Sequence, residues 1–378
     1  MRHQQPRGGT TTRSYDRCIS ALNRDEPDMV PIFEFGMEIP ILEKVLGRKL
    51  PTFKECDFQN PRVRADDVVR AYETLGLDMI TVTDDSFFSE SGRPVWRDAR
   101  TFVNEFRQVW RVDEARNTEL YLGGGIQLSD DTEAPGLDPY ALGRTRFASE
   151  IVKAADGKSI AVAANIHGGF SSAYLSCGME NFLVGVLRYP LQVQKLISAF
   201  TDFWTELSKH LIDIGVDVIG VGDDLAYKHG PFVPPEHWRH LAKPSLEQIV
   251  RAVKRRGALV FFHSDGNISP VLDDIVNIGF DGLHSMEPLA GMDIAYIKKK
   301  YGEKLCLLGN VDCSHTLCFG SLPEVYEETR QVIEKASPGG GHILSSSNSL
   351  HSAVKLENFL TMVATGRKLG RYPLSSLG

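Results

Sequence analysis

Long apolar runs, paired cysteines and an excess of positive charge are all missing from this chain of 378 residues. No apolar run approaches the roughly 20 residues that are needed to span a bilayer. The N-terminal stretch 1–14 lacks the apolar segment of a secretory signal, and we expect it to be a flexible tail. The formal net charge of −7 argues against broad nucleic-acid binding. We therefore expect neither a membrane nor a nucleic acid as a partner.

Two further absences narrow the class of protein. No C-x-x-C pair occurs among the six cysteines, which suggests reduced thiols and a cytoplasmic protein. Neither G-x-G-x-x-G nor G-x-x-x-x-G-K-[ST] follows any predicted strand, so the usual signature of a nucleotide-binding open sheet is missing.

The sequence does contain a regular alternation of buried strands with amphipathic helices. The eight predicted strands cover residues 30–35, 79–82, 159–166, 216–221, 258–262, 281–285, 305–308 and 342–344. Eight strand–helix units are the number in a (β/α)8 TIM barrel, and a doubly wound open sheet is the main competitor. Residues 95–122 interrupt this alternation and are predicted to form a β-hairpin excursion. We expect one barrel domain over residues 15–378.

The strongest candidate for chemistry is the fifth strand with the turn at its carboxyl end, A-L-V-F-F-H-S-D-G over residues 258–266. His263 and Asp265 are two positions apart, so their side chains should point the same way, because side chains alternate along a strand. Three interpretations remain open: a structural hydrogen bond, general acid–base work, or metal binding.

Polar residues also end most of the other predicted strands. Any one of them is more often a turn or helix-cap residue, but their repetition at the carboxyl ends predicts one polar mouth. Besides His263 and Asp265, we assign catalytic roles to Asp224 and Glu287. The predicted substrate-binding residues are Glu34, Asp85, His167, Asn310 and Asn348.

Several stretches resemble the uroporphyrinogen decarboxylase (URO-D) superfamily. They include G-D-D-L-A, F-F-H-S-D-G-N, G-F-D-G-L-H-S-M-E-P, G-M-D-I, L-L-G-N-V-D and L-E-N-F-L, and the resemblance covers about residues 15–372. The superfamily contains the heme-pathway decarboxylase and methyltransferases that act with corrinoid proteins or coenzyme M. The resemblance implies a (β/α)8 barrel with its site at the carboxyl mouth.

Differences between this chain and the family's motifs indicate which branch of the superfamily it resembles. The decarboxylase has an arginine-rich R-Q-A-G-R stretch that grips substrate carboxylates, whereas this chain has the acidic F-E-F-G-M-E, with Glu34 and Glu38. The corrinoid-linked methyltransferases bind zinc through H-x-C-G and a late cysteine. Here His263 matches, Asp265 replaces the first cysteine, and Asn348 falls near the second.

The resemblance thus favours a methyltransferase that moves a methyl group between a small methylated substrate and a corrinoid protein. The alternatives are uroporphyrinogen decarboxylation, a lyase reaction of porphyrin biosynthesis, and a non-catalytic binding barrel. We expect no tightly bound cofactor, because both thiolate ligands of the zinc pattern are missing. The alternative is zinc held by His263 and Asp265, with a third ligand from the sixth or eighth strand.

Overall fold

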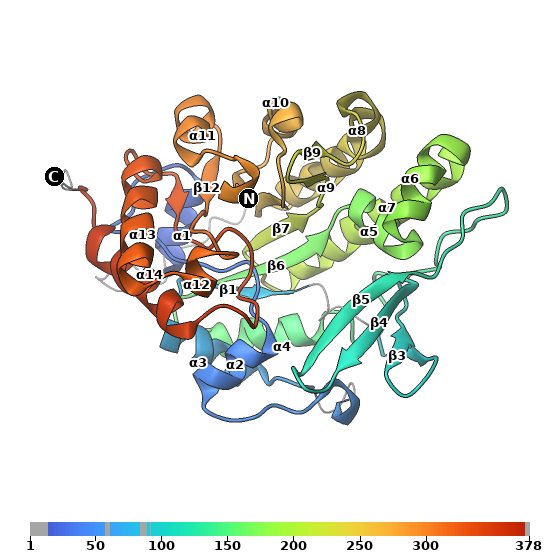
Figure 1. Ribbon diagram of the computed structural model, residues 1–378, viewed down its shortest axis with the longest axis horizontal. Helices are drawn as coiled ribbons and strands as arrows, with labels where there is room; N and C mark the ends of the chain where they lie inside the picture. Colours follow the sequence, from blue (N-terminus) through green and yellow to red (C-terminus); the bar gives the residue numbers. More distant parts are fainter. Residues whose placement is uncertain (1–13, 57–60, 84–88, 91, 375–378) are drawn as a thin grey trace.

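Seven parallel strands form a curled sheet whose spatial order follows the chain (Figure 1). The computed structural model describes residues 14–56, 61–83, 89–90 and 92–374. The strands are β1 (Met79–Val82), β6 (Ala161–His167), β7 (Val218–Gly222), β10 (Leu259–Ser264), β11 (Gly282–Ser285), β12 (Cys306–Leu308) and β13 (His342–Ile343). All were predicted to within about two residues, the usual uncertainty of an element end.

Residues 30–35, which were predicted as the first strand, close the sheet into a barrel. Ile32 bridges to Leu344 beside β13, and Phe33 bridges to Met79 of β1, both in the parallel sense. The Phe33 amide donates to the Leu344 carbonyl at 3.0 Å, and the Asp78 amide donates to the Ile32 carbonyl at 2.8 Å. The predicted (β/α)8 barrel is therefore confirmed, with this segment as the eighth strand position.

Helices cover the outside of the barrel (Figure 1). They are α1 (Ser14–Leu22), α2 (Ile39–Leu46), α3 (Ala65–Leu75), α4 (Arg146–Ala155), α5 (Gly169–Cys177), α6 (Met179–Arg188), α7 (Pro190–Asp213), α8 (Pro235–Leu241), α9 (Lys243–Arg255), α10 (Leu272–Ile278), α11 (Ile294–Tyr301), α12 (Thr316–Phe319), α13 (Leu322–Ala336) and α14 (Leu356–Leu369). The break expected at Pro190 separates α6 from α7, because proline is favoured in a first helical turn. Within the part of the chain that is described, no helix is long and apolar enough to cross a membrane.

The interior of the barrel is filled from the strands and is closed at its base by α1. Alternate strand residues point inward, so Ala161 and Ala163 of β6 belong to the inner cluster while Val162 packs against the outer helices. Cys18 and Leu22 of α1 are fully buried in that same inner cluster. The Tyr15 amide donates to the Ser159 carbonyl at 2.7 Å, which holds α1 beside the start of β6.

A buried carboxylate ties both ends of the chain to this base. Asp78 is inaccessible to solvent and accepts from Arg17 of α1 at 3.3 Å and from Arg367 of α14 at 2.7 Å. Its second oxygen also accepts the Ile32 amide at 2.8 Å. A buried charge needs such partners, because an unpaired one would be strongly destabilising.

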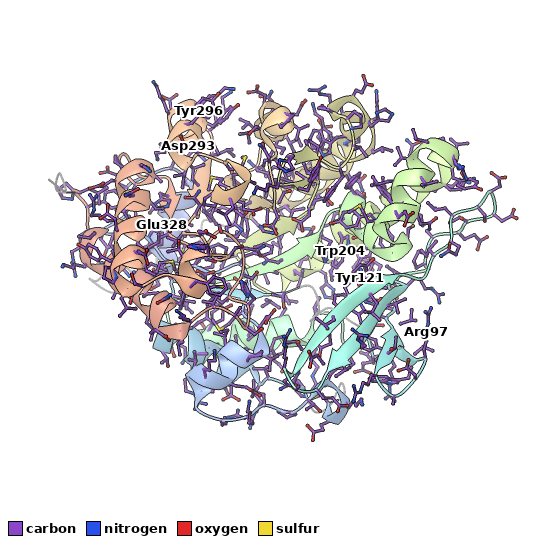
Figure 2. The ribbon with its side chains drawn as sticks, in the orientation of Figure 1. Arg97, Tyr121, Trp204, Asp293, Tyr296 and Glu328 are labelled. Carbon is purple, nitrogen blue, oxygen red and sulfur yellow. The ribbon has the colours of Figure 1, made fainter. Side chains whose placement is uncertain are left out.

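The excursion is larger than the single hairpin we predicted. It is a four-stranded antiparallel sheet of β2 (Val95–Trp96), β3 (Thr101–Val103), β4 (Gln108–Asp113) and β5 (Thr118–Gly124). The charged residues between Trp96 and Thr101 form a turn rather than strand. The sheet docks on α5, where the Tyr121 hydroxyl donates to the Leu175 carbonyl at 2.7 Å (Figure 2 labels Tyr121).

Candidate active site at the barrel mouth

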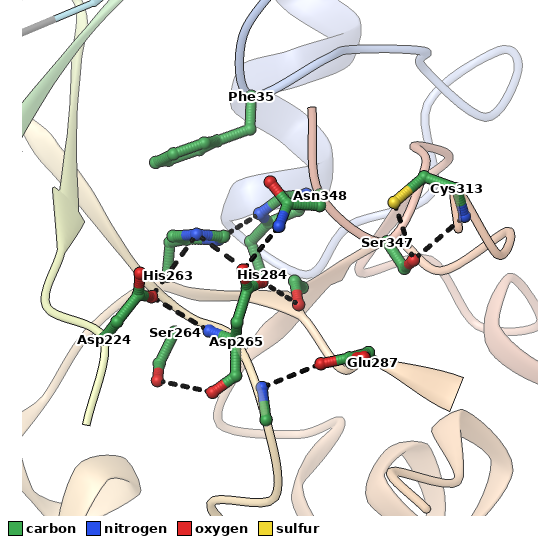
Figure 3. A network of polar contacts seen from close by, with 12 residues as sticks. Phe35, Asp224, His263, Ser264, Asp265, His284, Glu287, Cys313, Ser347 and Asn348 are labelled. Atoms are coloured by element: carbon green, nitrogen blue, oxygen red, sulfur yellow. Dashed lines mark hydrogen bonds and ion pairs between the residues drawn. The ribbon is translucent and has the colours of Figure 1, made fainter. Parts of the chain in front are cut away.

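His263 is the buried centre of a polar cluster at the carboxyl end of β10 (Figure 3). The three residues before it, Val260 to Phe262, are apolar and fully buried, and His263 itself is 4% exposed. Its Nε2 lies 3.7 Å from Asp224 Oδ1 and 3.8 Å from Asp265 Oδ1. The imidazole is therefore held inside the barrel, while its Nε2 atom faces two carboxyl groups at the mouth.

The two carboxyl groups are fixed by the loops that follow β7 and β10. The Asp265 amide donates to Asp224 Oδ1 at 3.0 Å, which links the loops directly. Asp265 also accepts from Ser285 Oγ at 3.2 Å and from the Asn348 side-chain amide. About a third of each carboxyl side chain remains exposed, 39% for Asp224 and 34% for Asp265, so the cluster is open to a small molecule.

The environment favours neutral forms of the central groups. Burial lowers the pKa of His263 to about 4, so its imidazole is uncharged at neutral pH. Burial, together with the nearby Asp224 and Glu287, raises the pKa of Asp265 well above its usual value. Glu287 is held close by, because its Oε2 accepts the Gly266 amide at 3.0 Å. An uncharged imidazole therefore lies beside a carboxyl group that holds its proton more tightly than usual.

His284 of β11 completes the cluster and was not among the residues we predicted. Its Nδ1 lies 2.8 Å from Nδ1 of His263, and its Nε2 lies 3.3 Å from Ser345 Oγ. The two histidines share one register on neighbouring parallel strands. Because one Nδ1 must donate and the other accept, the tautomers of the two imidazoles are coupled.

Phe35, the last residue of the segment 30–35 that closes the barrel, covers both imidazoles. Its ring stacks on His263 with centroids 3.9 Å apart and on His284 with centroids 5.2 Å apart. An aromatic face against a neutral imidazole excludes water, which accounts for the burial that keeps both histidines uncharged.

A second buried carboxyl group lies beside the cluster. Asp223 accepts the Ser171 amide at 2.7 Å through Oδ1, whereas its Oδ2 is buried without a hydrogen-bond partner. Burial raises its pKa to about 7. Gly168 allows this position, since a Cβ there would lie 2.2–2.5 Å from the carboxyl atoms. The neighbouring residues Asp223 and Asp224 thus face different ways, with Asp224 at the open mouth and Asp223 turned inward.

The remaining predicted residues are spread more widely. His167 lies near Asp223 and contributes to lowering the pKa of His263. Asn310 is buried and donates to the Met286 carbonyl at 2.7 Å, so it holds the turn after β11. Asp85 lies outside the described residues. The structure therefore brings Asp224, His263, Asp265, Glu287 and Asn348 together, and their catalytic and binding roles remain predictions.

Glu34 was predicted to bind substrate. It lies in the seam, the line along which residues 30–35 meet β13 and the residues that follow it. It is fully buried, and its two oxygens accept the amide of Ser346 at 2.9 Å and the hydroxyl of Ser346 at 2.6 Å. Burial raises its pKa from 4.5 to about 8.

This shift predicts how stability depends on pH. The folded chain holds the Glu34 proton more tightly than the unfolded chain, so the stability due to this group is full below pH 4.5 and is lost as the pH rises through about 8. In Glu34→Gln the side-chain carbonyl can accept the Ser346 amide while the side-chain NH2 donates to the Ser346 hydroxyl, and the group does not ionise. We expect the variant to melt above the wild type at pH 9 and close to it at pH 5, as measured by calorimetry. An equal difference between the two proteins at both pH values would contradict this account.

The cluster fits a divalent cation that takes nitrogen and oxygen ligands. One atom each from Asp224, His263 and Asp265 can be chosen so that all three lie within 4.8 Å of one another. The His284 contact to the far nitrogen of His263 is the outer hydrogen bond that metal-binding histidines usually have. The third ligand would be Asp224, after β7, and not a residue of the sixth or eighth strand as we expected. Glu287 and Asn348 are instead engaged with Gly266 and Asp265.

The fold and the cluster define a (β/α)8 barrel whose polar site lies at the carboxyl mouth. The model of the uroporphyrinogen decarboxylase (URO-D) family matches residues 128–369. The chain belongs to this family, as its sequence motifs implied.

Individual relatives fall in two branches of the family. A methylcobamide:CoM methyltransferase of Methanosarcina barkeri is 23% identical over 67% of this chain and 75% of its own length. A uroporphyrinogen decarboxylase of Chlorobium phaeobacteroides is 23% identical over 51% of this chain and 55% of its own. A solved methyltransferase from Methanosarcina mazei superposes with a TM-score of 0.75 at 19% identity, covering 95% of this chain and 99% of the other. The solved structure supports the fold, and the longer match to the methylcobamide:CoM methyltransferase favours the methyltransferase branch.

Proposed function

We propose that this protein transfers a methyl group between a small methylated substrate and a corrinoid carried by a partner protein. The observation that carries the proposal is the cluster in which Nε2 of His263 faces the carboxyl groups of Asp224 and Asp265 at an open barrel mouth. The methylcobamide-dependent relative supplies the reaction type.

Transfer of a methyl group from oxygen or nitrogen requires that a proton be delivered to the atom that the methyl group leaves. When cob(I)alamin attacks a methyl group on oxygen or nitrogen, the methyl–heteroatom bond breaks and its electron pair stays on the heteroatom. Asp265, whose pKa is raised well above its usual value, holds a proton more tightly than an ordinary aspartate, and we assign it the role of supplying that proton. The nearby carboxyl groups of Asp224 and Glu287 favour the protonated form of Asp265, so the proton is readily regained from solvent after each turnover.

His263 orients the acid and the substrate. Its neutral Nε2 lies within 4 Å of both carboxyl groups, Phe35 stacks on the plane of its ring, and His284 couples to its tautomer. A divalent cation bound by Asp224, His263 and Asp265 would supply Lewis-acid polarisation of the leaving atom.

The experiment is a methyl-transfer assay with purified protein, cob(I)alamin and a panel of methyl ethers and methylamines. Conversion of cob(I)alamin to methylcobalamin changes its visible absorption, which reports the transfer directly. We expect conversion with one donor class, and a loss of conversion in Asp265→Asn. The same protein incubated with uroporphyrinogen should release no carbon dioxide, because the mouth presents acidic groups to a polycarboxylate. Robust decarboxylation would contradict the proposal and favour the lyase reaction.

A further inference from the structure

A cavity of about 560 Å³ lies on the excursion and shares no lining residue with the barrel-mouth cluster. Its volume is that of a small-molecule site. One side of it is formed by alternate residues of β2, β3 and their flanks, namely Arg93, Val95, Arg97, Val103, Glu105 and Arg107. The facing side is the loop at residues 135–137.

The alternation explains why these side chains gather. Val95 pairs with Val103 across the β2–β3 hairpin, so odd-numbered residues on both strands share a face. The even-numbered face is the packed one: Phe102 stacks on Phe53 at 4.7 Å between ring centroids, and Trp96 lies against both. Because the apolar rings occupy one face, the arginines are left to the other, beside β3 (Figure 2 labels Arg97).

The positive charge of the arginines on this face is not neutralised by carboxylates of the described residues. Over the described ranges, no ion pair joins a carboxylate to the guanidinium group of Arg93, Arg97 or Arg107. Glu105 is the acidic residue of the lining, and its oxygens are already engaged with the two terminal nitrogens of Arg144, each at 3.0 Å. Three cations without a carboxylate partner among the described residues therefore meet in one cavity of a chain whose net charge is −7.

Glu105 of the lining is held from behind by Arg144, a buried arginine that does not itself line the cavity. Arg144 is 1% exposed, and its guanidinium lies over the Phe203 ring at 4.9 Å. Gly125 allows Arg107 and Arg97 to approach the backbone closely. A Cβ at this position would come within 2.9 Å of the Arg107 carbonyl and 3.8 Å of the Arg97 guanidinium. Arg93, Arg97 and Arg107 are exposed, so a ligand can reach them from solvent.

We propose that this cavity binds an organic anion with two or more negative charges, carried as phosphate or carboxylate groups. The planar guanidinium forks match both groups bidentately, and Val95 and Val103 contact the apolar part of the ligand. The site is separate from the methyl-transfer cluster, so it does not depend on the function proposed for that cluster.

Isothermal titration calorimetry of the full-length protein tests the site at low ionic strength, with pyrophosphate as the phosphate probe and citrate as the carboxylate probe. We expect saturable binding of at least one probe, weakened about tenfold or more in R97Q/R107Q, because charge-assisted hydrogen bonds are lost. The matched control is R111Q, which removes an exposed arginine of β4 outside the cavity and should bind within about twofold of the wild type. The tighter probe identifies the charged group.

Absence of saturable binding for both probes would overturn the proposal, as would equal binding by wild type and R97Q/R107Q. If R97Q/R107Q does not fold, R97K/R107K keeps the charge and loses the bidentate fork. Its affinity should then lie below that of the wild type, and unchanged affinity would count against a guanidinium site.

Discussion

Replacing His263 by alanine is expected to lower the rate of methyl transfer by about two to four orders of magnitude, the range for a lost acid–base group. The imidazole lies within 4 Å of both Asp224 and Asp265, so its loss also removes the ring that separates the two carboxyl groups from the barrel interior. Initial rates of methylcobalamin formation measure the effect. We expect the loss to come from proton transfer and positioning more than from lost metal.

Two controls separate these causes. His240→Ala removes an exposed histidine of α8 and should leave the rate within about twofold, since surface changes rarely propagate. Elemental analysis of the wild type and of His263→Ala reports the metal. Stoichiometric zinc in the wild type that is absent from the variant would show that the site holds zinc tightly without thiolate ligands, and would contradict this expectation.

Replacing Arg144 by methionine is expected to cost about 3–5 kcal/mol of unfolding free energy, because it strands a carboxylate that is largely buried. The Glu105 side chain is 12% exposed, and Arg144 is its only charged partner among the ion pairs of the described residues. Its oxygens also accept the Ser89 amide at 2.9 Å and the Ser89 hydroxyl at 3.2 Å. Urea unfolding at neutral pH measures the loss.

The double variant Arg144→Met/Glu105→Gln should recover much of the loss, because the uncompensated charge is gone while the contacts to Ser89 remain. Arg146→Met is the matched comparison. It breaks a helical pair with Glu150 whose side chains are 43% and 39% exposed, and it should cost less than about 1 kcal/mol. Similar losses for Arg144→Met and Arg146→Met would refute a special role for the buried pair.

The barrel was predictable because its strands are short apolar runs separated by amphipathic helices. Such a pattern reflects only which residues are buried, and the local sequence is enough to show it. The pair His263 and Asp265 was found for the same reason, since it stands at the end of the most apolar strand. Asp224 was found from its place after another strand.

His284 could not be singled out in the same way. A lone histidine in D-G-L-H-S is most often a satisfied core residue, and its role depends on strand register, which pairs it with His263. Phe35 likewise comes to the site only through the closure of the barrel. Glu34 was predicted to bind substrate because it lies near the end of residues 30–35. Its side chain instead turns into the seam toward Ser346. Register and closure are tertiary properties, so the local pattern does not contain them.

The seam has a consequence for how this chain is made. Glu34 and Ser346 lie 312 positions apart, so the ribosome needs about 15–60 s to add the second partner after the first. Throughout that time residues 30–35 have an unpaired side, and each new strand is the temporary edge of an open sheet. Exposed edges pair readily with other chains, so we expect the nascent protein to need chaperones until β13 emerges. Premature stop codons anywhere before β13 should therefore yield aggregates rather than shorter folded products.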